Sequence, residues 1–283
     1  MTATGRALRL AERTPAWLLA GAGALAAEAL SFRPPRPVRQ WQVNAMVATG
    51  QAPSRRQTAG AIRSWARNLG ESAQLAHWSA ERVADTIIIS DEDRARLLGA
   101  HRDGGAVVAL PHMGSWDLAG AWACGMGMPV STVAEQIPEF DYFVAARQRI
   151  GMKVHGHRAG HLVPTLAEDL RAGHLVCLLS DRKLGSGGTP VEWPTPTGPL
   201  PVRLPAGAAT IALQTGATLL GIACHYEGRK MRLVVSPALR PAAHADPVTS
   251  LNQQLAAFFA SQVSSNPVDW HMLQRFFPEH EAS

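Results

Sequence analysis

A histidine and an aspartate five residues apart, His112 and Asp117, have the residue types and spacing that suit acid–base chemistry. The apolar run 106–110 predicts a buried strand, Pro111 ends it, and an apolar helical pattern begins after Ser115. On one regular helix, a step of five residues would leave the two side chains about 140° apart. They can meet only if His112 lies on the turn and Asp117 in the first helical turn. A carboxylate placed in this way fixes the tautomer of the imidazole and stabilises the imidazolium.

The same two residues also have a purely structural interpretation. An Asp in the first turn of a helix gains about 0.3–1 kcal/mol from the helix dipole, and a His at a strand end often only packs. The sequence has no Gly-x-Ser-x-Gly motif and no Cys beside a candidate base, so a covalent acyl-enzyme has no evident nucleophile. If the pair is catalytic, we expect a general base that directs a substrate hydroxyl onto an activated acyl group such as a thioester. Helix N-terminal amides near Gly114 and an Arg would then stabilise the oxyanion.

The rest of the chain alternates strand and helix patterns, which predicts a single α/β domain. The expected strands are 85–90, 106–110, 129–135, 152–157, 175–180, 218–226 and 231–239. The expected helices are 57–84 with a possible break at Gly70, 91–100, one after Ser115, 139–150, 161–171, 206–215 and 248–264. Residues 227–230 join the last two strands as a hairpin, so we expect a central mixed β-sheet flanked by helices. The Gly- and Pro-rich stretch 185–205 predicts no strong element except at 191–193.

Positive charge is concentrated at the N-terminus. Residues 1–70 hold ten Arg and only two Glu, whereas the remaining residues have a small negative balance. Apolar side chains alternate with these arginines, which favours an anionic membrane surface as partner over a solvated or nucleic-acid-binding arm. Three prolines within 31–41 predict a linker or a sharp turn. We therefore expect a basic, membrane-associating leader at 1–41, a catalytic domain at 42–283, and no nucleic-acid partner.

Residues 17–30 form the longest apolar stretch of the chain. As a helix they would reach about 21 Å, short of the ~30 Å hydrocarbon core of a bilayer. We therefore expect an amphipathic helix that lies on the cytoplasmic face of the membrane. A signal peptide is the alternative, because arginines precede the stretch and residues 24–26 resemble a cleavage site. Three widely spaced cysteines in apolar surroundings are typical of buried thiols in a reducing compartment and argue against export.

The run His-Met-Gly-Ser-Trp-Asp at 112–117 resembles the His-x4-Asp motif of glycerolipid acyltransferases. With Trp before the acid, it is most similar to the bacterial lipid A biosynthesis acyltransferase superfamily, whose fold is lysophospholipid acyltransferase-like. Within that superfamily it resembles the phosphatidylinositol mannoside acyltransferases of actinobacteria. Further segments agree with the family in order, at 132–135, 147–151, 176–182, 204–207, 215–217 and 269–275. An Ala-, Arg- and Gly-rich composition with almost no Lys is typical of a high-GC actinobacterium.

The resemblance implies an enzyme that transfers a long-chain acyl group from acyl-CoA to a mannose hydroxyl of a phosphatidylinositol mannoside. No cofactor is expected, since acyl-CoA is a co-substrate. The resemblance assigns the general base to His112 and its support to Asp117. It also implies a glutamate in the segment after Asp181 and Arg182 as a further partner of His112. That role is assigned to Glu192, the only acidic residue between Asp181 and Glu227.

Six further residues are expected to bind the acyl-CoA and glycolipid substrates: Glu135, Arg147, Arg149, Arg182, Trp270 and His271. The two arginines at 147 and 149 suit a phosphate or an oxyanion, although Arg also stabilises a helix C-terminus without any ligand. Arg182 would contact a donor phosphate or merely neutralise the adjacent Asp181. Trp270 and His271 would line the acyl or acceptor pocket, with ordinary core packing as the alternative.

Three other functions stay open at this point. The acceptor could be lipid A-like or a lysophospholipid, or the protein could bind lipid on the same fold without catalysis. A metallohydrolase is the third, because His155, His157 and His161 are closely spaced. His155 and His157 would share one face of a strand. No third ligand has a fixed spacing, so we expect no metal.

Overall fold

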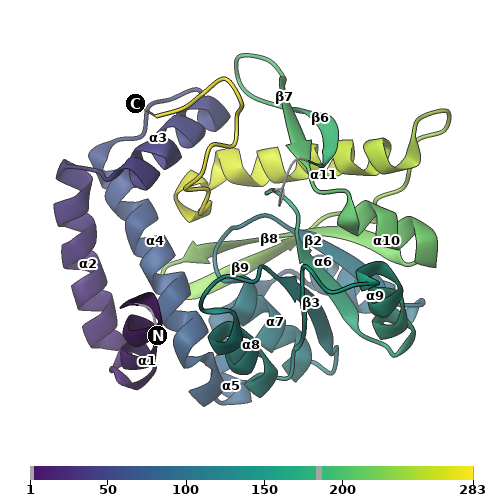
Figure 1. The fold of residues 1–283 in the computed structure, drawn as a ribbon, viewed down its shortest axis with the longest axis horizontal. Helices are drawn as coiled ribbons and strands as arrows, with labels where there is room; N and C mark the ends of the chain where they lie inside the picture. The colour runs from purple at the N-terminus through teal and green to yellow at the C-terminus, as the bar shows by residue number, and fades with distance from the viewer. Residues whose placement is uncertain (1–2, 183–186, 283) are drawn as a thin grey trace.

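A seven-stranded mixed β-sheet lies at the centre of the molecule, with strand order β1-β9-β8-β2-β5-β3-β4 (Figure 1). The computed structural model describes residues 3–182 and 187–282. Its strands are β1 (Ile87–Ile89), β2 (Ala106–Leu110), β3 (Val130–Ala134), β4 (Lys153–Gly156), β5 (Leu175–Leu179), β8 (Thr218–Glu227) and β9 (Lys230–Val235). Strands β8, β2, β5, β3 and β4 are parallel to one another. Strand β9 pairs antiparallel with β8, and β1 pairs parallel with β9 at the edge of the sheet. The predicted α/β fold with a mixed sheet and the β8–β9 hairpin are confirmed.

Helices cover both faces of this sheet. They are α1 (Ala3–Arg13), α2 (Ala16–Phe32), α3 (Arg36–Thr49), α4 (Arg55–Gln74), α5 (Ala80–Thr86), α6 (Asp91–Arg102), α7 (Trp116–Gly125), α8 (Phe140–Arg149), α9 (Leu162–Arg171), α10 (Gly207–Thr215) and α11 (Pro247–Ser265). Two short 3-10 helices are η1 (Leu75–His77) and η2 (Pro267–Asp269). Figure 1 shows α10 and α11 on one side of the sheet and α7 and α8 on the other.

Strand β2 explains how one apolar run serves both faces. Val107 and Ala109 belong to the core formed with α9, α10 and α11, while Val108 and Leu110 belong to the core formed with α6 and α7. Successive side chains of a strand point to opposite faces, so a central parallel strand needs apolar residues at every position. Full burial of a Val or Leu side chain contributes about 1.5–3 kcal/mol, which anchors the strand that carries the turn at His112.

A separate two-stranded hairpin, β6 (Thr189–Trp193) and β7 (Leu200–Leu204), packs on α11. The sequence predicted only the last three residues of β6, at 191–193. The alternation of the strand turns Val191 and Trp193 into the core and leaves Glu192 exposed. Residues 183–186 of the predicted Gly- and Pro-rich stretch lie outside the described residues.

The apolar stretch at 17–30 is one helix, α2, which packs against α4 together with α1 (Figure 1). None of the helices in the described ranges combines the length and the apolar character needed to cross a membrane. The Pro-rich segment is a sharp turn at 33–35, and it is followed directly by α3, a helix that was not predicted. Residue 41, where we divided leader from domain, lies within that helix.

Helix α4 runs without a break through Gly70, where the sequence had left a break open. Ser54 and Gln57 form a capping box at its start. At Gly70 the helix faces Leu19 of α2. Packing against α1 and α2 along its length offsets the intrinsic cost of about 1 kcal/mol that a Gly brings to a helix interior.

Candidate active site

The site lies where strands β2 and β5 end side by side. Leu110 of β2 is in register with Leu179 of β5. Two residues beyond each of these positions the chain carries a titratable side chain, His112 after β2 and Asp181 after β5. Parallel α/β sheets bind ligands at this carboxyl edge of their strands. The register therefore brings a histidine and a carboxylate together at the edge where a ligand is expected.

His112 is held by Asp181 at two points. Nδ1 of the imidazole lies 2.5 Å from Oδ1 of the carboxylate, and the backbone N–H of His112 donates to Oδ2 at 2.9 Å. The Asp181 side chain is completely buried, whereas that of His112 is 16% exposed. Because Nδ1 is engaged by the carboxylate, Nε2 is the ring nitrogen left for a ligand.

The Asp181 carboxyl is ionised despite its burial. Burial by itself would raise its pKa, but the charge of His112 and hydrogen bonds from His112 and Trp270 hold the pKa below its ordinary value. The indole Nε1 of Trp270 donates to Oδ2 of this carboxylate at 2.9 Å. A buried carboxylate that orients an imidazole in this way makes His112 suited to act as a general base.

His112 borders a cavity of about 360 Å³ between α9, α10 and the ends of the parallel strands. Its wall is mostly apolar and includes Val133, Leu162, Val163, Leu166, Leu178 and Ile211. Among its polar lining residues, Arg182 and Glu135 form an ion pair at 2.6 Å. The first turn of α10 also borders the cavity, and its cap residue Ala206 makes no side-chain hydrogen bond to the helix. An apolar cavity with a few convergent polar groups is typical of a small-molecule site.

Asp117 lies in the first turn of α7, as predicted, but it points away from His112. Its carboxylate accepts hydrogen bonds from Arg147 Nε at 2.7 Å and from Ser72 Oγ at 2.8 Å. Within residues 3–182 and 187–282, no hydrogen bond joins Asp117 to His112. The ring of Trp116 meets the His112 ring edge-on instead, with 5.5 Å between the centroids. The expected contact between Asp117 and His112 is therefore not formed, and Asp181 takes its place.

Arg147 forms a buried ion pair with Asp117. Its side chain is 14% exposed and that of Asp117 is 5% exposed, and both border a second, largely apolar cavity of about 50 Å³. Its Nε and Nη2 atoms face the Asp117 carboxylate, and its role in substrate binding stays a prediction. The structure thus gives Arg147 an internal partner that the spacing did not predict.

Two other predicted site residues are not brought to His112. Glu192 is exposed on β6, its backbone pairs with the Gln253 side chain, and it is not among the residues bordering the cavity. Arg149, the last residue of α8, forms an ion pair with Glu12 of α1 at 3.1 Å. Their roles in substrate binding and catalysis stay predictions.

The C-terminal segment reaches the site through its backbone and through Trp270. The N–H of His271 donates to the His112 carbonyl at 2.7 Å, and the N–H of Gly114 donates to the Asp269 carbonyl at 3.0 Å. Met113 and Trp270 form a β-bridge between these two contacts. The amide of Gly114 itself is therefore engaged by this contact. The Trp270 side chain is completely buried, and neither it nor His271 borders the cavity beside His112.

The His271 ring is neutral and has a defined tautomer. Ser64 Oγ donates to Asp269 Oδ1 at 2.6 Å and lies 3.0 Å from His271 Nε2. Since the single hydroxyl proton goes to the carboxylate, the ring nitrogen is the donor of the second bond. Burial, together with the charge of His112, lowers the pKa of His271 to about 3.

The residue that sequence reasoning missed is Asp181. It was recognised only as the end of the strand at 175–180. The available signal was that Asp181 follows an apolar parallel strand in the same way that His112 does. The neighbouring strands β2 and β5 are separated in the chain by β3 and β4, so this adjacency is not readable from spacing.

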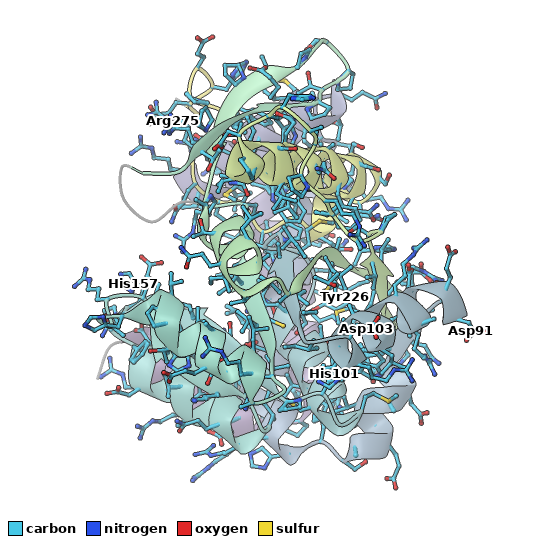
Figure 2. The ribbon with its side chains drawn as sticks, turned by 90° about the vertical axis from the view of Figure 1, so that its right-hand side faces the viewer. Asp91, His101, Asp103, His157, Tyr226 and Arg275 are labelled. Carbon is cyan, nitrogen blue, oxygen red and sulfur yellow. The ribbon has the colours of Figure 1, made fainter. Side chains whose placement is uncertain are left out.

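Two of the three closely spaced histidines are bound to other groups. His155 Nε2 lies 2.7 Å from the buried Asp169, and His157 Nδ1 accepts from the Gln136 backbone at 3.0 Å. Figure 2 shows His157 at one edge of the molecule, far from Asp91 at the start of α6. In the described part of the chain, no group of three or more His, Cys, Asp or Glu could hold a metal ion.

The cysteine thiols are free, and two of them have no nucleophilic character at neutral pH. Cys224 is buried, while Cys124 and Cys177 are half-buried as residues. Burial of the thiol raises the pKa of Cys177 and of Cys224 to about 12. Such thiols remain protonated and do not attack an acyl group.

Comparison with known proteins gives one consistent result. The family model described as bacterial lipid A biosynthesis acyltransferase matches residues 51–278. A phosphatidylinositol mannoside acyltransferase of Mycolicibacterium smegmatis is 36% identical over 219 residues, which cover 75% of this chain and 69% of that protein. A protein of the same name from Mycobacterium tuberculosis is 39% identical over 219 residues, covering 75% of this chain and 66% of its own length. The matched segment thus spans about two thirds of the length of these relatives.

Proposed function

The chain belongs to the bacterial lipid A biosynthesis acyltransferase family, and we propose that it moves a long-chain acyl group from acyl-CoA to a mannose hydroxyl of a phosphatidylinositol mannoside. The names of the mycobacterial relatives support the mannoside acceptor. The observation that carries the proposal is the His112–Asp181 pair at the wall of a mostly apolar cavity of about 360 Å³. That arrangement suits an apolar acyl chain whose reactive carbonyl lies beside a base.

In this mechanism Nε2 of His112 takes the proton of the sugar hydroxyl while the oxygen attacks the thioester carbonyl. The tetrahedral intermediate then expels the CoA thiolate, which takes the proton back from the imidazolium. Asp181 keeps the other ring proton on Nδ1 and stabilises the imidazolium charge. General-base catalysis of this kind contributes roughly 10²- to 10⁴-fold in rate. No acyl-enzyme is required.

Positive charge near the cavity suits the negative charge that develops during transfer. Arg182 is held in place by Glu135, and the amides of the first turn of α10 have no capping side chain. Helix N-terminal amides and guanidinium groups both stabilise an oxyanion or a phosphate. We assign donor binding to these groups, since the amide of Gly114 itself is engaged by Asp269.

We also propose that the leader docks on the anionic cytoplasmic face of the cell membrane as a peripheral protein. Large apolar side chains are strongly exposed along α1 and α2, with Leu10, Trp17, Leu25 and Phe32 each about 70% or more accessible. Six arginines lie within residues 6–39 against two glutamates. Exposed apolar side chains flanked by arginines suit insertion among anionic lipid headgroups.

The proposed function is tested with purified protein, long-chain acyl-CoA and a mannosylated phosphatidylinositol, with the acylated product followed by mass spectrometry. His112→Ala should lower turnover by about 10²- to 10⁴-fold. His244→Asn is the control, because it replaces an exposed histidine at positive φ by a residue that tolerates this conformation. Wild-type turnover by His112→Ala would contradict the mechanism. Activity on a lysophospholipid but not on the mannoside would support the alternative acceptor.

A further inference from the structure

We propose that Trp270 is a positioning residue whose indole N–H sets how strongly Asp181 holds the proton on Nδ1 of His112. Nε1 of Trp270 donates to Asp181 Oδ2 at 2.9 Å, and the indole is completely buried. The same oxygen accepts the backbone N–H of His112, while Oδ1 faces the imidazole. The indole therefore acts on the base through the carboxylate. Its kinetic consequence rests on the proposed function.

The indole is held from several sides. Trp193 of β6 stacks on it with 6.0 Å between the ring centroids and an interplanar angle of 15°. Phe276 meets it edge-on at 5.0 Å. Trp41 of α3 donates its own Nε1–H to the Trp270 carbonyl at 3.0 Å, and Met113 pairs with the Trp270 backbone. A donor fixed by α3, β6 and the catalytic turn costs little further ordering when it binds Asp181.

Each donor on Oδ2 draws negative charge toward itself and lowers the proton affinity of the carboxylate. With two N–H groups on Oδ2, Asp181 accepts the imidazole proton less strongly than it would with one. The backbone N–H of His112 stays in place without the indole, so the carboxylate keeps its two contacts with His112. Loss of the indole donor should therefore make Asp181 a stronger acceptor rather than release it.

The other titratable groups near the pair do not supply this effect. His271, on the same C-terminal segment, is neutral because its pKa is lowered to about 3 by burial. Arg182 and Glu135 pair with each other across the cavity wall. His157 borders the cavity and binds the Gln136 backbone through Nδ1. Among the residues that the structure describes, the remaining donors to the carboxylate belong to His112 itself, so the Trp270 indole is the contact that can be removed selectively.

The chain offers a matched control in Trp193. Both indoles are completely buried in one aromatic cluster, and they stack on each other. In the described part of the chain, Nε1 of Trp193 has no hydrogen-bond partner. Trp270→Phe and Trp193→Phe thus remove the same atoms from the same cluster, but only the first removes a hydrogen bond to Asp181.

The test is an NMR titration of the full chain with ¹⁵N-labelled histidine, in which the His112 imidazole signal among the eleven histidines is assigned with His112→Gln. In Trp270→Phe the titration midpoint of His112 should move up by about 0.5 to 1 pH unit. The acidic limb of the pH profile of kcat/KM should move to higher pH by the same amount. Trp193→Phe should leave both unchanged. If Trp270→Phe does not fold, replacing Trp270 by benzothienylalanine keeps the bicyclic ring and removes only the N–H.

An unshifted or lowered midpoint in the Trp270 variants, or an equal shift in Trp193→Phe, would overturn the proposal. The NMR readout needs no substrate, so the two proposals fail separately. A shifted midpoint in a protein without acyl-transfer activity would support the positioning role and reject the proposed function. Active variants without a shift would retain the function and reject the role of Trp270.

Discussion

Asp181 engages His112 through both of its carboxylate oxygens, one on the imidazole Nδ1 and the other on the backbone N–H of the same residue. The two contacts fix the position of the turn and the orientation of the ring together. A side chain that binds only the imidazole would leave the backbone of the turn free. The pair is therefore rigid before any substrate binds, which reduces the ordering that must occur in the transition state.

Asp181→Asn should place the wrong tautomer at the site. Oδ2 accepts two N–H groups, so the amide oxygen of Asn must occupy that position and its NH₂ must face Nδ1. The proton of the neutral imidazole then sits on Nε2, where the base is needed. Steady-state kinetics should show kcat lower by about 10²- to 10⁴-fold with little change in KM. A kcat within about threefold of wild type would contradict this assignment.

The Asp117–Arg147 pair should contribute to stability. Arg147→Met leaves the buried Asp117 carboxylate without its cation, and breaking a buried pair costs about 3–5 kcal/mol. The double variant Asp117→Asn/Arg147→Met has no isolated charge and should recover part of the free energy of unfolding. Urea denaturation of the two single variants and the double variant completes the cycle. Strictly additive losses would show that the two side chains act independently.

Glu192→Gln should leave turnover unchanged. Glu192 is exposed on β6, and the alternation of that strand turns it away from the core that β6 shares with α11. Acyl-transfer assays on wild type and variant at saturating substrate provide the comparison. A loss of about tenfold or more would restore Glu192 to the catalytic role that the family resemblance assigned to it.

His271 should make the protein less stable as the pH falls. Its pKa is about 3 in the folded chain, against about 6.5 for an unperturbed histidine. Between these values the unfolded chain binds the proton and the native chain does not, so stability is lost on acidification. The free energy of unfolding should fall by up to about 1.4 kcal/mol for each pH unit of acidification. Chemical denaturation between about pH 4 and 6 should give a shallower slope for His271→Gln, and identical slopes would refute the burial effect.

The leader should bind membranes through its exposed apolar side chains. Trp17→Ser combined with Leu25→Ser should weaken sedimentation with anionic phospholipid vesicles by about tenfold or more, since it removes two large apolar groups. Leu213→Ser is the control, because Leu213 is an exposed leucine on α10, outside the leader. Salt should weaken wild-type binding by screening the arginines. Equal binding of both variants would mean that another surface docks.

Local patterns predicted the elements around the site well. The apolar run at 106–110 is β2, and Ser115 caps α7 by accepting from the Leu118 amide. These features depend on residues within a few positions of one another, so periodicity and capping signals reveal them. Helix α3 escaped prediction because its prolines suggested a linker, whereas Pro35 and Pro37 stand at the cap and in the first turn, where proline is tolerated.

By itself, the sequence determined that His112 stands on a strand-to-helix turn within an α/β domain of this family. Only the tertiary structure decided which side chains His112 meets. The rotation of α7 turns Asp117, five residues away, toward Arg147 and Ser72. Strand order brings Asp181 from the end of β5 beside the end of β2, although β3 and β4 lie between them in the chain. A partner set by the packing of distant strands has no signature in local spacing, and this is the physical reason that Asp181 was missed.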